Sequence, residues 1–210
     1  GGWASNNKFS LLAALRGASQ VISYELPMGL ALIALLMLTG SLKMSSILGQ
    51  QLDGWYNVLY QPLGFLIFFV CALAECNRTP FDLPEAENEL NFGYHQEYSS
   101  MKLGFYLFAE YINMFISSVV MATLFWGGYD IPFVNDVALG HHIGANWLAV
   151  LEGGSLFIKT VIFIFVFMWI RWTIPRFRYD QLMNLGWKGL IPLSLINMII
   201  TALVELWLHK

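Results

Sequence analysis

The sequence predicts an all-α fold, a polytopic transmembrane helical bundle with five spans in this chain, and three observations lead to that prediction. The 210 residues are 57% hydrophobic and only 12% charged, whereas an ordinary soluble domain carries about 25% charged residues. Sixteen Phe, nine Tyr and eight Trp suit a chain with lipid-facing surfaces and aromatic belts. Several apolar stretches also approach the length of about 20 residues that crossing a bilayer requires.

The five expected spans cover 21–42, 58–74, 103–126, 156–172 and 190–208. Each is bounded by polar residues, Gly or Pro. The second and fourth are near the lower length limit, so they need little tilt or some thinning of the bilayer. The sequence contains no evident internal repeat or linker. We therefore expect residues 1–210 to form a single membrane domain.

The distribution of Lys and Arg predicts how the spans are oriented. Three segments, namely the N-terminal end and the loops 75–102 and 171–188, hold most of these residues: Lys8, Arg16, Arg78, Lys102, Arg171, Arg176, Arg178 and Lys188. The other side holds Lys43 and Lys210, and Lys159 lies inside the fourth span. By the positive-inside rule those three segments are cytoplasmic. The loop 127–154 and the C-terminus are then expected outside.

Composition also excludes several functions. A net charge of −3 offers no basic surface for nucleic acid. The two cysteines, Cys71 and Cys76, are too few for a disulfide scaffold or for an iron–sulfur cluster with four thiolate ligands. The four histidines show no paired haem spacing, and no Gly-rich phosphate loop follows a strand. We therefore expect no metal site and no bound cofactor in this chain.

Two acidic residues inside predicted spans each lie beside a tyrosine, whereas Glu205 is a weaker case near the end of the last span. Glu25 follows Tyr24 in the first span, and Glu110 precedes Tyr111 in the third. A carboxylate at the bilayer centre costs about 2.5–3.5 kcal/mol on insertion scales. One interpretation is a neutral, hydrogen-bonded packing group near a helix end. We favour the other interpretation, a proton relay formed by these two acids and their neighbouring tyrosines.

The loop after the second span holds six of the fourteen acids together with Arg78; these acids are Glu75, Asp82, Glu85, Glu87, Glu89 and Glu97. Pro84 suits the first turn of a short helix that has Asp82 near its N-cap. Glu85 and Glu89 are then one turn apart, where like charges repel and raise the pKa of one partner. A solvated acidic loop is the alternative. Apolar residues between the acids favour a loop folded back into a cleft or docked on a partner.

The second cytoplasmic loop is basic and complements the first. Arg171, Arg176 and Arg178 alternate with aromatic residues, and Asp180 follows them. One interpretation is that the arginines snorkel to the interface and fix the topology. The other is that their guanidinium groups pair with the acidic loop or bind an anionic or quinone-like headgroup.

Residues 74–87 read Ala-Glu-Cys-Asn-Arg-Thr-Pro-Phe-Asp-Leu-Pro-Glu-Ala-Glu. This run closely resembles the signature loop of the quinone-site membrane subunit of respiratory complex I, which is the H subunit of bacterial NADH-quinone oxidoreductase and subunit 1 in mitochondria. Further matches follow in the family's order at 2–6, 14–16, 22–25, 97–99, 109–111 and 175–183. The family has eight spans. The resemblance implies that this chain is an N-terminally truncated fragment that supplies the last five.

The resemblance implies an enzyme subunit of a proton-pumping NADH:quinone oxidoreductase, with quinone as substrate and no redox centre in this chain. It implies a charged funnel that leads from the quinone cavity into the membrane, formed by Glu75, Arg78, Asp82, Glu85, Glu87, Glu89, Glu97, Arg171, Arg176, Arg178 and Asp180. Tyr24, Glu25, Glu110 and Tyr111 would continue this path as the proton relay.

The same resemblance implies partner subunits and a location. FMN and iron–sulfur clusters are expected in the peripheral arm subunits, and small membrane subunits, antiporter-like subunits and membrane lipid are expected as further partners. The implied location is a bacterial inner membrane. The stretch 91–96 departs from the family in its details, and we expect it not to touch the charged positions.

Two other functions remain as alternatives. One is the homologous membrane subunit of an energy-converting hydrogenase, which passes electrons to protons rather than to quinone. The complete acidic and arginine-rich motifs favour the quinone branch. The other is a proton-coupled secondary transporter that uses Glu25 and Glu110 as its proton site. Such transporters often contain inverted repeats, and the sequence shows none.

Overall fold

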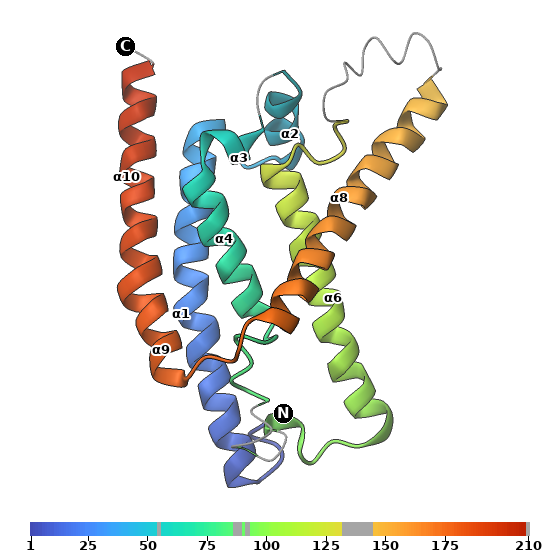
Figure 1. Ribbon diagram of the computed structural model, residues 1–210, viewed down its shortest axis with the longest axis vertical. Coiled ribbons are helices and arrows are strands. Elements are labelled where there is room, and N and C mark those ends of the chain that lie inside the picture. Colours follow the sequence, from blue (N-terminus) through green and yellow to red (C-terminus); the bar gives the residue numbers. More distant parts are fainter. Residues whose placement is uncertain (54–55, 86–89, 91–92, 132–144, 209–210) are drawn as a thin grey trace.

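The computed structural model describes residues 1–53, 56–85, 90, 93–131 and 145–208. Helices are the only regular secondary structure in these residues (Figure 1). The long elements are α1 (Lys8–Thr39), α6 (Ser100–Phe125), α8 (Ala145–Thr173) and α10 (Ile191–Leu208), and α4 (Pro62–Glu75) is shorter. Four segments are long and apolar enough to cross a membrane, at 8–39, 100–125, 146–173 and 179–207. The structure thus confirms a helical membrane bundle.

The second predicted span differs from expectation because its helix is interrupted at Gln61. A short helix, α3 (Asn57–Tyr60), precedes this residue, and α4 begins at Pro62. Gln61 has φ −132° and ψ 65°, since a residue before proline is disfavoured in the α region. The 14 residues of α4 rise about 21 Å, which is less than the roughly 30 Å hydrocarbon core.

The buried side chain of Gln61 explains how this break is accommodated in an apolar setting. Its Nε2 donates to the Ala34 carbonyl at 2.9 Å and to Thr201 Oγ1 at 3.2 Å. The contacts come from α1 and α10, so one residue joins three elements. Irregular backbone at membrane depth is tolerated where it is buried in protein.

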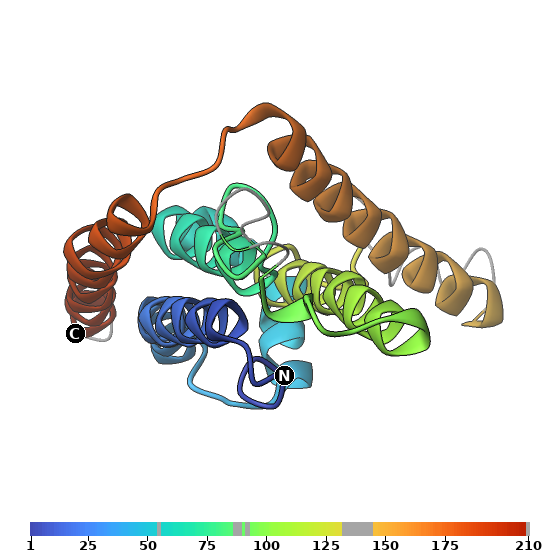
Figure 2. The ribbon, with the colours of Figure 1, turned by 90° about the horizontal axis from the view of Figure 1, so that it is seen from below.

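Figures 1 and 2 show how the long helices are arranged. Helix α1 packs against both α4 and α10, whereas α8 packs mainly against α6 and leans away from the other helices. Another helix, α2 (Met44–Asp53), follows α1 at the end of the bundle far from the N-terminus. The N-terminus and the C-terminal end of α10 lie at opposite ends of the bundle (Figure 1).

The fifth span is continuous with the segment before it. Helix α9 (Tyr179–Asn184) leads through a π-helical turn, η2 (Leu185–Leu190), into α10. This corner is anchored to α1, because Tyr24 donates to the Leu182 carbonyl at 3.0 Å and Trp187 Nε1 donates to Ser23 Oγ at 3.0 Å. The fixed corner places the loop 171–178 beside the loop that follows α4.

Candidate functional site

The loop after α4 is folded against α1. Gln20 of α1 is buried and donates through Nε2 to the carbonyls of Ala74 and Phe81, both at 2.8 Å. The same nitrogen donates to Asn77 Oδ1 at 3.3 Å. Phe81 is buried, and its ring packs edge-on against that of Tyr24 at 5.6 Å. These contacts favour the folded-back loop over the solvated one.

Arg78 and Glu110 connect this loop to the third long helix. The Arg78 Nη2 and Glu110 Oε2 atoms are 2.9 Å apart, and the two side chains are only 11% and 9% exposed. The contact is an ion pair without the alignment of a good hydrogen bond. The guanidinium also lies 4.6 Å from the centre of the Tyr111 ring. A loop cation therefore compensates a carboxylate inside α6.

A single 3₁₀ turn, η1 (Gly93–His95), brings two more side chains to Glu110. The Tyr94 hydroxyl donates a hydrogen bond to Glu110 Oε1 at 3.4 Å. His95 Nε2 lies 3.8 Å from the same oxygen and 3.6 Å from Glu85 Oε1. The expectation that residues 91–96 do not touch the charged positions is therefore wrong. Arg78, Glu85, Tyr94, His95 and Glu110 are called the Glu110 cluster below.

Gly93 explains why this turn reaches the acidic loop. Its φ is +64°, a region that L side chains rarely adopt, and a Cβ there would overlap the Pro84 carbonyl oxygen. Only glycine allows so close an approach of two backbones. The Ser10 hydroxyl of α1 also donates to the Gly93 carbonyl at 3.3 Å. Backbone geometry therefore sets the distance between His95 and Glu85.

The loop acids are held in an environment that favours their neutral forms. Burial, reinforced by the charge of Glu110, raises the pKa of Glu85 to about 7. Burial and the charge of Glu85 raise the pKa of Asp82 to about 6. The Glu85 amide donates to the Asp82 carboxylate, as expected for an N-cap residue. These two carboxyl groups therefore gain and lose protons near neutral pH.

The arginines of the second loop divide into two groups. The positive charges of Arg171 and Arg176 act on Glu85 and Asp82 respectively, which opposes the rise in their pKa values. Arg178 and Asp180 are exposed at the start of α9. Phe177 holds this loop against the first one, since its amide donates to the Pro80 carbonyl at 3.2 Å.

Several predicted site residues lie away from the Glu110 cluster. Glu97 is exposed and accepts from Asn7 Nδ2 at 3.2 Å. Glu25 is exposed on α1, and its negative charge acts on the side chain of Glu75. The hydroxyl of Tyr24 is used in the contact with Leu182. The predicted positions Glu87 and Glu89 lie outside the described residues.

Glu75 ends α4, and its backbone carbonyl is linked to α6. Asn113 of α6 donates its Nδ2 to the Glu75 carbonyl at 3.3 Å. The side chain of Glu75 is partly buried. The end of α4 is thereby fixed to α6 one helical turn beyond Glu110.

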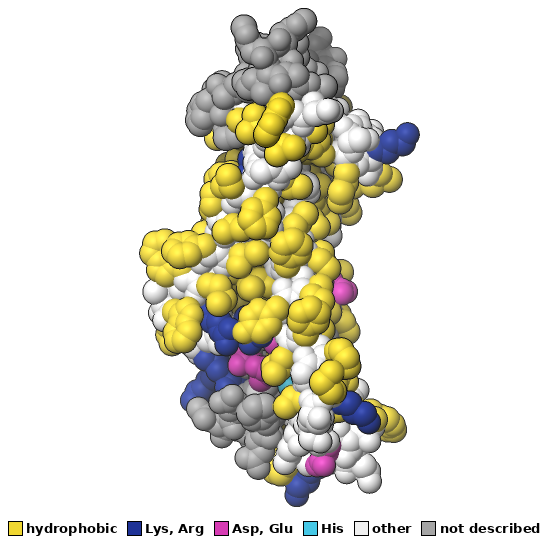
Figure 3. Space-filling view, turned by 90° about the vertical axis from the view of Figure 1, so that its right-hand side faces the viewer, with side chains coloured by type: hydrophobic (Ala, Val, Ile, Leu, Met, Phe, Trp, Pro, Cys, Tyr) yellow, Lys and Arg dark blue, Asp and Glu magenta, His cyan; other side chains and the backbone are white. Residues whose placement is uncertain are grey.

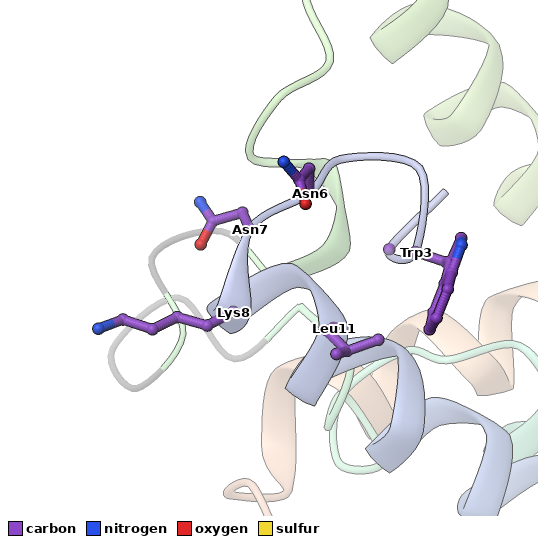
Figure 4. A pocket seen from close by; sticks show the side chains of 6 residues that line it. Trp3, Asn6, Asn7, Lys8 and Leu11 are labelled. Carbon is purple, nitrogen blue, oxygen red and sulfur yellow. The ribbon is translucent and has the colours of Figure 1, made fainter.

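A small cavity of about 210 Å³ lies between α1, the acidic loop and η1. Small residues of α1, including Ala14 and Gly17, form one wall, and Asn77, Pro84 and Tyr94 line the cavity as well. Another cavity, of about 290 Å³, lies at the start of α1. Figure 4 shows Trp3 and Leu11 on one side of this second cavity and Lys8 pointing away from it.

The face shown in Figure 3 has one concentration of charge in its lower half. Acidic, basic and histidine side chains meet there, below a band of hydrophobic side chains. Glu85, His95 and Glu110 each present one atom within 4.8 Å of the others, a spacing compatible with a shared proton or a cation. Arg78 already pairs with Glu110, so a divalent cation would meet repulsion there. A shared proton suits the site better.

The sequence pattern alone does not identify Tyr94 and His95 as members of the site. Their signal is a histidine and a tyrosine placed directly after a glycine, within a run of acids. That signal cannot be read without knowing that Gly93 has a positive φ. Gln20 is also missed, because an isolated glutamine in an apolar helix gives no indication of its partners.

Comparison of the sequence with known proteins identifies the family of this chain. A family model described as NADH dehydrogenase matches residues 1–202. The chain is 63% identical over 202 residues to the NADH-quinone oxidoreductase H subunit 1 of Cytophaga hutchinsonii, covering 96% of this chain and 58% of that protein. It is 60% identical over 206 residues to the H subunit of Flavobacterium johnsoniae, covering 98% of this chain and 58% of that protein.

A more distant relative gives the same result. NADH-quinone oxidoreductase subunit 8 of Rhodothermus marinus is 51% identical over 208 residues, covering 96% of this chain and 61% of that protein. The chain thus spans about three fifths of the length of these relatives. Because the match extends over nearly the whole chain, the chain belongs to the NADH dehydrogenase family.

Proposed function

We propose that this chain is part of the membrane subunit of a proton-pumping NADH:quinone oxidoreductase. In this role it forms part of the quinone cavity and the carboxylate path that couples quinone reduction to proton translocation. The curated relatives are named as subunits of such an oxidoreductase. Their names support the quinone branch over the hydrogenase and transporter alternatives.

The observation that carries the proposal is the position of Tyr94. This residue lines the cavity of about 210 Å³ between α1 and the acidic loop, and its hydroxyl donates to Glu110 at 3.4 Å. One side chain therefore connects a space beside the loop with a carboxylate inside a membrane-crossing helix. A change of charge in the cavity has a direct route to Glu110.

The chemistry follows from charge balance. Reduction of a quinone to its quinol consumes two electrons and two protons, and an uncompensated charge in a poorly solvated cavity is costly. Asp82 and Glu85 titrate near neutral pH and belong to the same loop as Pro84, which lines the cavity. We infer that they exchange protons in response to quinone reduction, and that Glu110 receives the change through Arg78 and Tyr94.

The path is proposed to continue to Glu25. Its position at the surface of α1 suits contact with a neighbouring subunit, such as an antiporter-like subunit, or with the part of the full-length protein beyond this chain. Arg178, Asp180 and Glu97 are exposed, so we assign them to the interface with the peripheral arm. Glu87 and Glu89 complete the funnel in this proposal.

Partners and location belong to the same proposal. The peripheral arm subunits supply FMN and the iron–sulfur clusters, and small membrane subunits and lipid surround the helices. The location is a bacterial inner membrane, with the loops 75–102 and 171–188 cytoplasmic and the C-terminus outside. The count of eight Lys and Arg against two supports this orientation.

The proposal is tested by purifying the native complex through an affinity tag on this subunit. We expect flavin and iron–sulfur subunits to co-purify, together with quinone reductase activity that quinone-site inhibitors abolish. A photoreactive quinone should label the segments that contain Gly17 and Tyr94. A stable protein that purifies alone, or one that carries the nickel-binding large subunit of a hydrogenase, would contradict the proposal.

A further inference from the structure

The His95 side chain is buried beside two carboxyl groups. It is 1% exposed, and neither ring nitrogen forms a hydrogen bond within the described part of the chain. Buried polar groups are normally satisfied, so an exception of this kind requires an explanation. Packing alone does not provide one, because a phenyl ring fills similar space at no polar cost.

The location of the imidazole supplies the explanation. Nε2 lies 3.6 Å from Glu85 Oε1 on the acidic loop and 3.8 Å from Glu110 Oε1 on α6. Both distances exceed the usual donor–acceptor distance of a hydrogen bond by less than 1 Å. A small movement of either carboxyl therefore brings it into hydrogen-bond contact with the same nitrogen.

The ring itself is held in place by its aromatic neighbours. The centre of the Tyr94 ring lies 3.7 Å from that of His95, and the Tyr106 ring of α6 lies 5.1 Å away. Gly93 fixes the turn from which His95 projects. The imidazole is therefore held beside the two carboxyl groups, which also share a side-chain hydrogen bond with each other.

The surrounding charges define the resting state. Glu85 faces the ring from the loop, Glu110 and Tyr106 face it from α6, and Tyr94 lies beside it. Burial lowers the pKa of His95, which favours the neutral imidazole. Arg78 engages Oε2 of Glu110 and the Tyr94 hydroxyl donates to Oε1 at 3.4 Å, so the imidazole shares Oε1 with that hydroxyl.

We propose that His95 is a relay residue that carries a proton between Glu85 and Glu110. The Nε2 lone pair takes the proton from the Glu85 carboxyl, which becomes a carboxylate, and an imidazolium forms between the two acids. Nε2 then releases the proton to Oε1 of Glu110, and the imidazole returns to its neutral form. This inference rests on the proposed function, since it assigns a carrier within the same relay.

The test uses the complete oxidoreductase in membrane vesicles, with the full-length subunit carrying His95→Gln or His95→Phe. Glutamine retains polarity and phenylalanine retains the ring packing, but neither carries a proton at this pH. We expect both variants to assemble, to lower quinone reduction at least tenfold, and to lose the dependence of the rate on pH between 6 and 8. General acid–base groups typically contribute about 10²–10⁴-fold.

A structural role gives a different result, namely a near wild-type rate and pH profile in the phenylalanine variant, and that result would overturn the inference. Glu110→Gln is measured in parallel to separate the two proposals. If Glu110→Gln abolishes pumping while both His95 variants pump normally, only the role of His95 is wrong. If Glu110→Gln is also normal, the proposed relay fails as a whole.

A spectroscopic measurement covers the case in which the His95 variants do not assemble. Infrared difference spectra are recorded on quinone reduction in the wild-type complex and in Tyr106→Phe, both with ring-¹³C histidine. We expect an isotope-sensitive imidazole band that shifts in Tyr106→Phe, because Tyr106 borders His95. A spectrum without such a band, or a band unchanged by Tyr106→Phe, would overturn the inference.

Discussion

Arg78 and Glu110 form a 2.9 Å ion pair between the loop after α4 and the long apolar helix α6, with both side chains about nine-tenths buried. The pair gives the loop a fixed position relative to α6. It also makes the charge state of Glu110 depend on a residue that belongs to the loop.

Removal of Arg78 alone should destabilise the subunit. Arg78→Met leaves the Glu110 carboxylate buried without its cation, and breaking a buried pair in this way costs about 3–5 kcal/mol. We expect much less assembled complex on native gels. The double variant Arg78→Met/Glu110→Gln removes both charges and should restore assembly without restoring proton pumping. Normal assembly of the single variant would show that the pair is not needed for stability.

Stability should depend on pH through Glu85. Its pKa in the folded protein, about 7, is raised above the usual value of 4.5, so the folded state binds the proton more tightly than the unfolded state. The stabilising contribution is complete below pH 4.5 and is lost as the pH rises towards 7. We expect the melting temperature of the complex to fall over this window. Glu85→Gln should flatten the curve, and an unchanged slope would contradict the assignment.

Gly93 should not tolerate a side chain. Gly93→Ala combines a positive φ with an overlap at the Pro84 carbonyl, and a left-handed backbone alone costs an L residue about 1–2 kcal/mol. We expect a lower melting temperature and slower quinone reduction, because His95 moves away from Glu85. Gly104→Ala is the matched control, since nothing lies within 4 Å of its Cβ position. Equal effects of the two substitutions would argue against the close approach.

Lys159 should act as a structural anchor at the end of α6 that is far from Glu110. Its buried ammonium donates to the carbonyls of Trp126, Gly128 and Asp130 at 2.7, 3.1 and 2.7 Å. Hydrogen bonds to charged groups contribute about 1.5–3 kcal/mol each, so Lys159→Met should lower the melting temperature by several degrees. The exposed Lys102 of α6 provides the control substitution Lys102→Met. A stable Lys159→Met variant would show that the end of α6 is held by other contacts.

The approximate positions of the spans were predictable because a helix that crosses the bilayer needs an apolar stretch of a set length. Three of the five helices begin earlier than expected, because polar residues such as Lys8 and Asn146 extend them beyond the apolar core. The break at Gln61 was not predicted, since residues 58–74 were expected to form one continuous span across the Gln-Pro pair. Hydropathy also gave no indication of the π-helical turn before α10.

The candidate site was only partly predictable. The motif drew attention to Arg78, Asp82 and Glu85, and the structure places these residues close to Glu110. It did not reveal the partners of Glu110, because Tyr94 and His95 reach it through the tertiary position of Gly93. Glu25 stood out as an acid in a span, yet it is exposed on α1. A single sequence does not show which face of a helix a neighbouring subunit covers.

The central claim is that Glu110 couples quinone reduction to proton movement, and the number of protons translocated per electron tests it most directly. The measurement uses the complete oxidoreductase in sealed vesicles, comparing wild type with Glu110→Gln and with Glu152→Gln of α8 as a control. We predict that Glu110→Gln loses proton translocation and slows quinone reduction, whereas Glu152→Gln matches wild type. A wild-type ratio and rate in Glu110→Gln would contradict the claim.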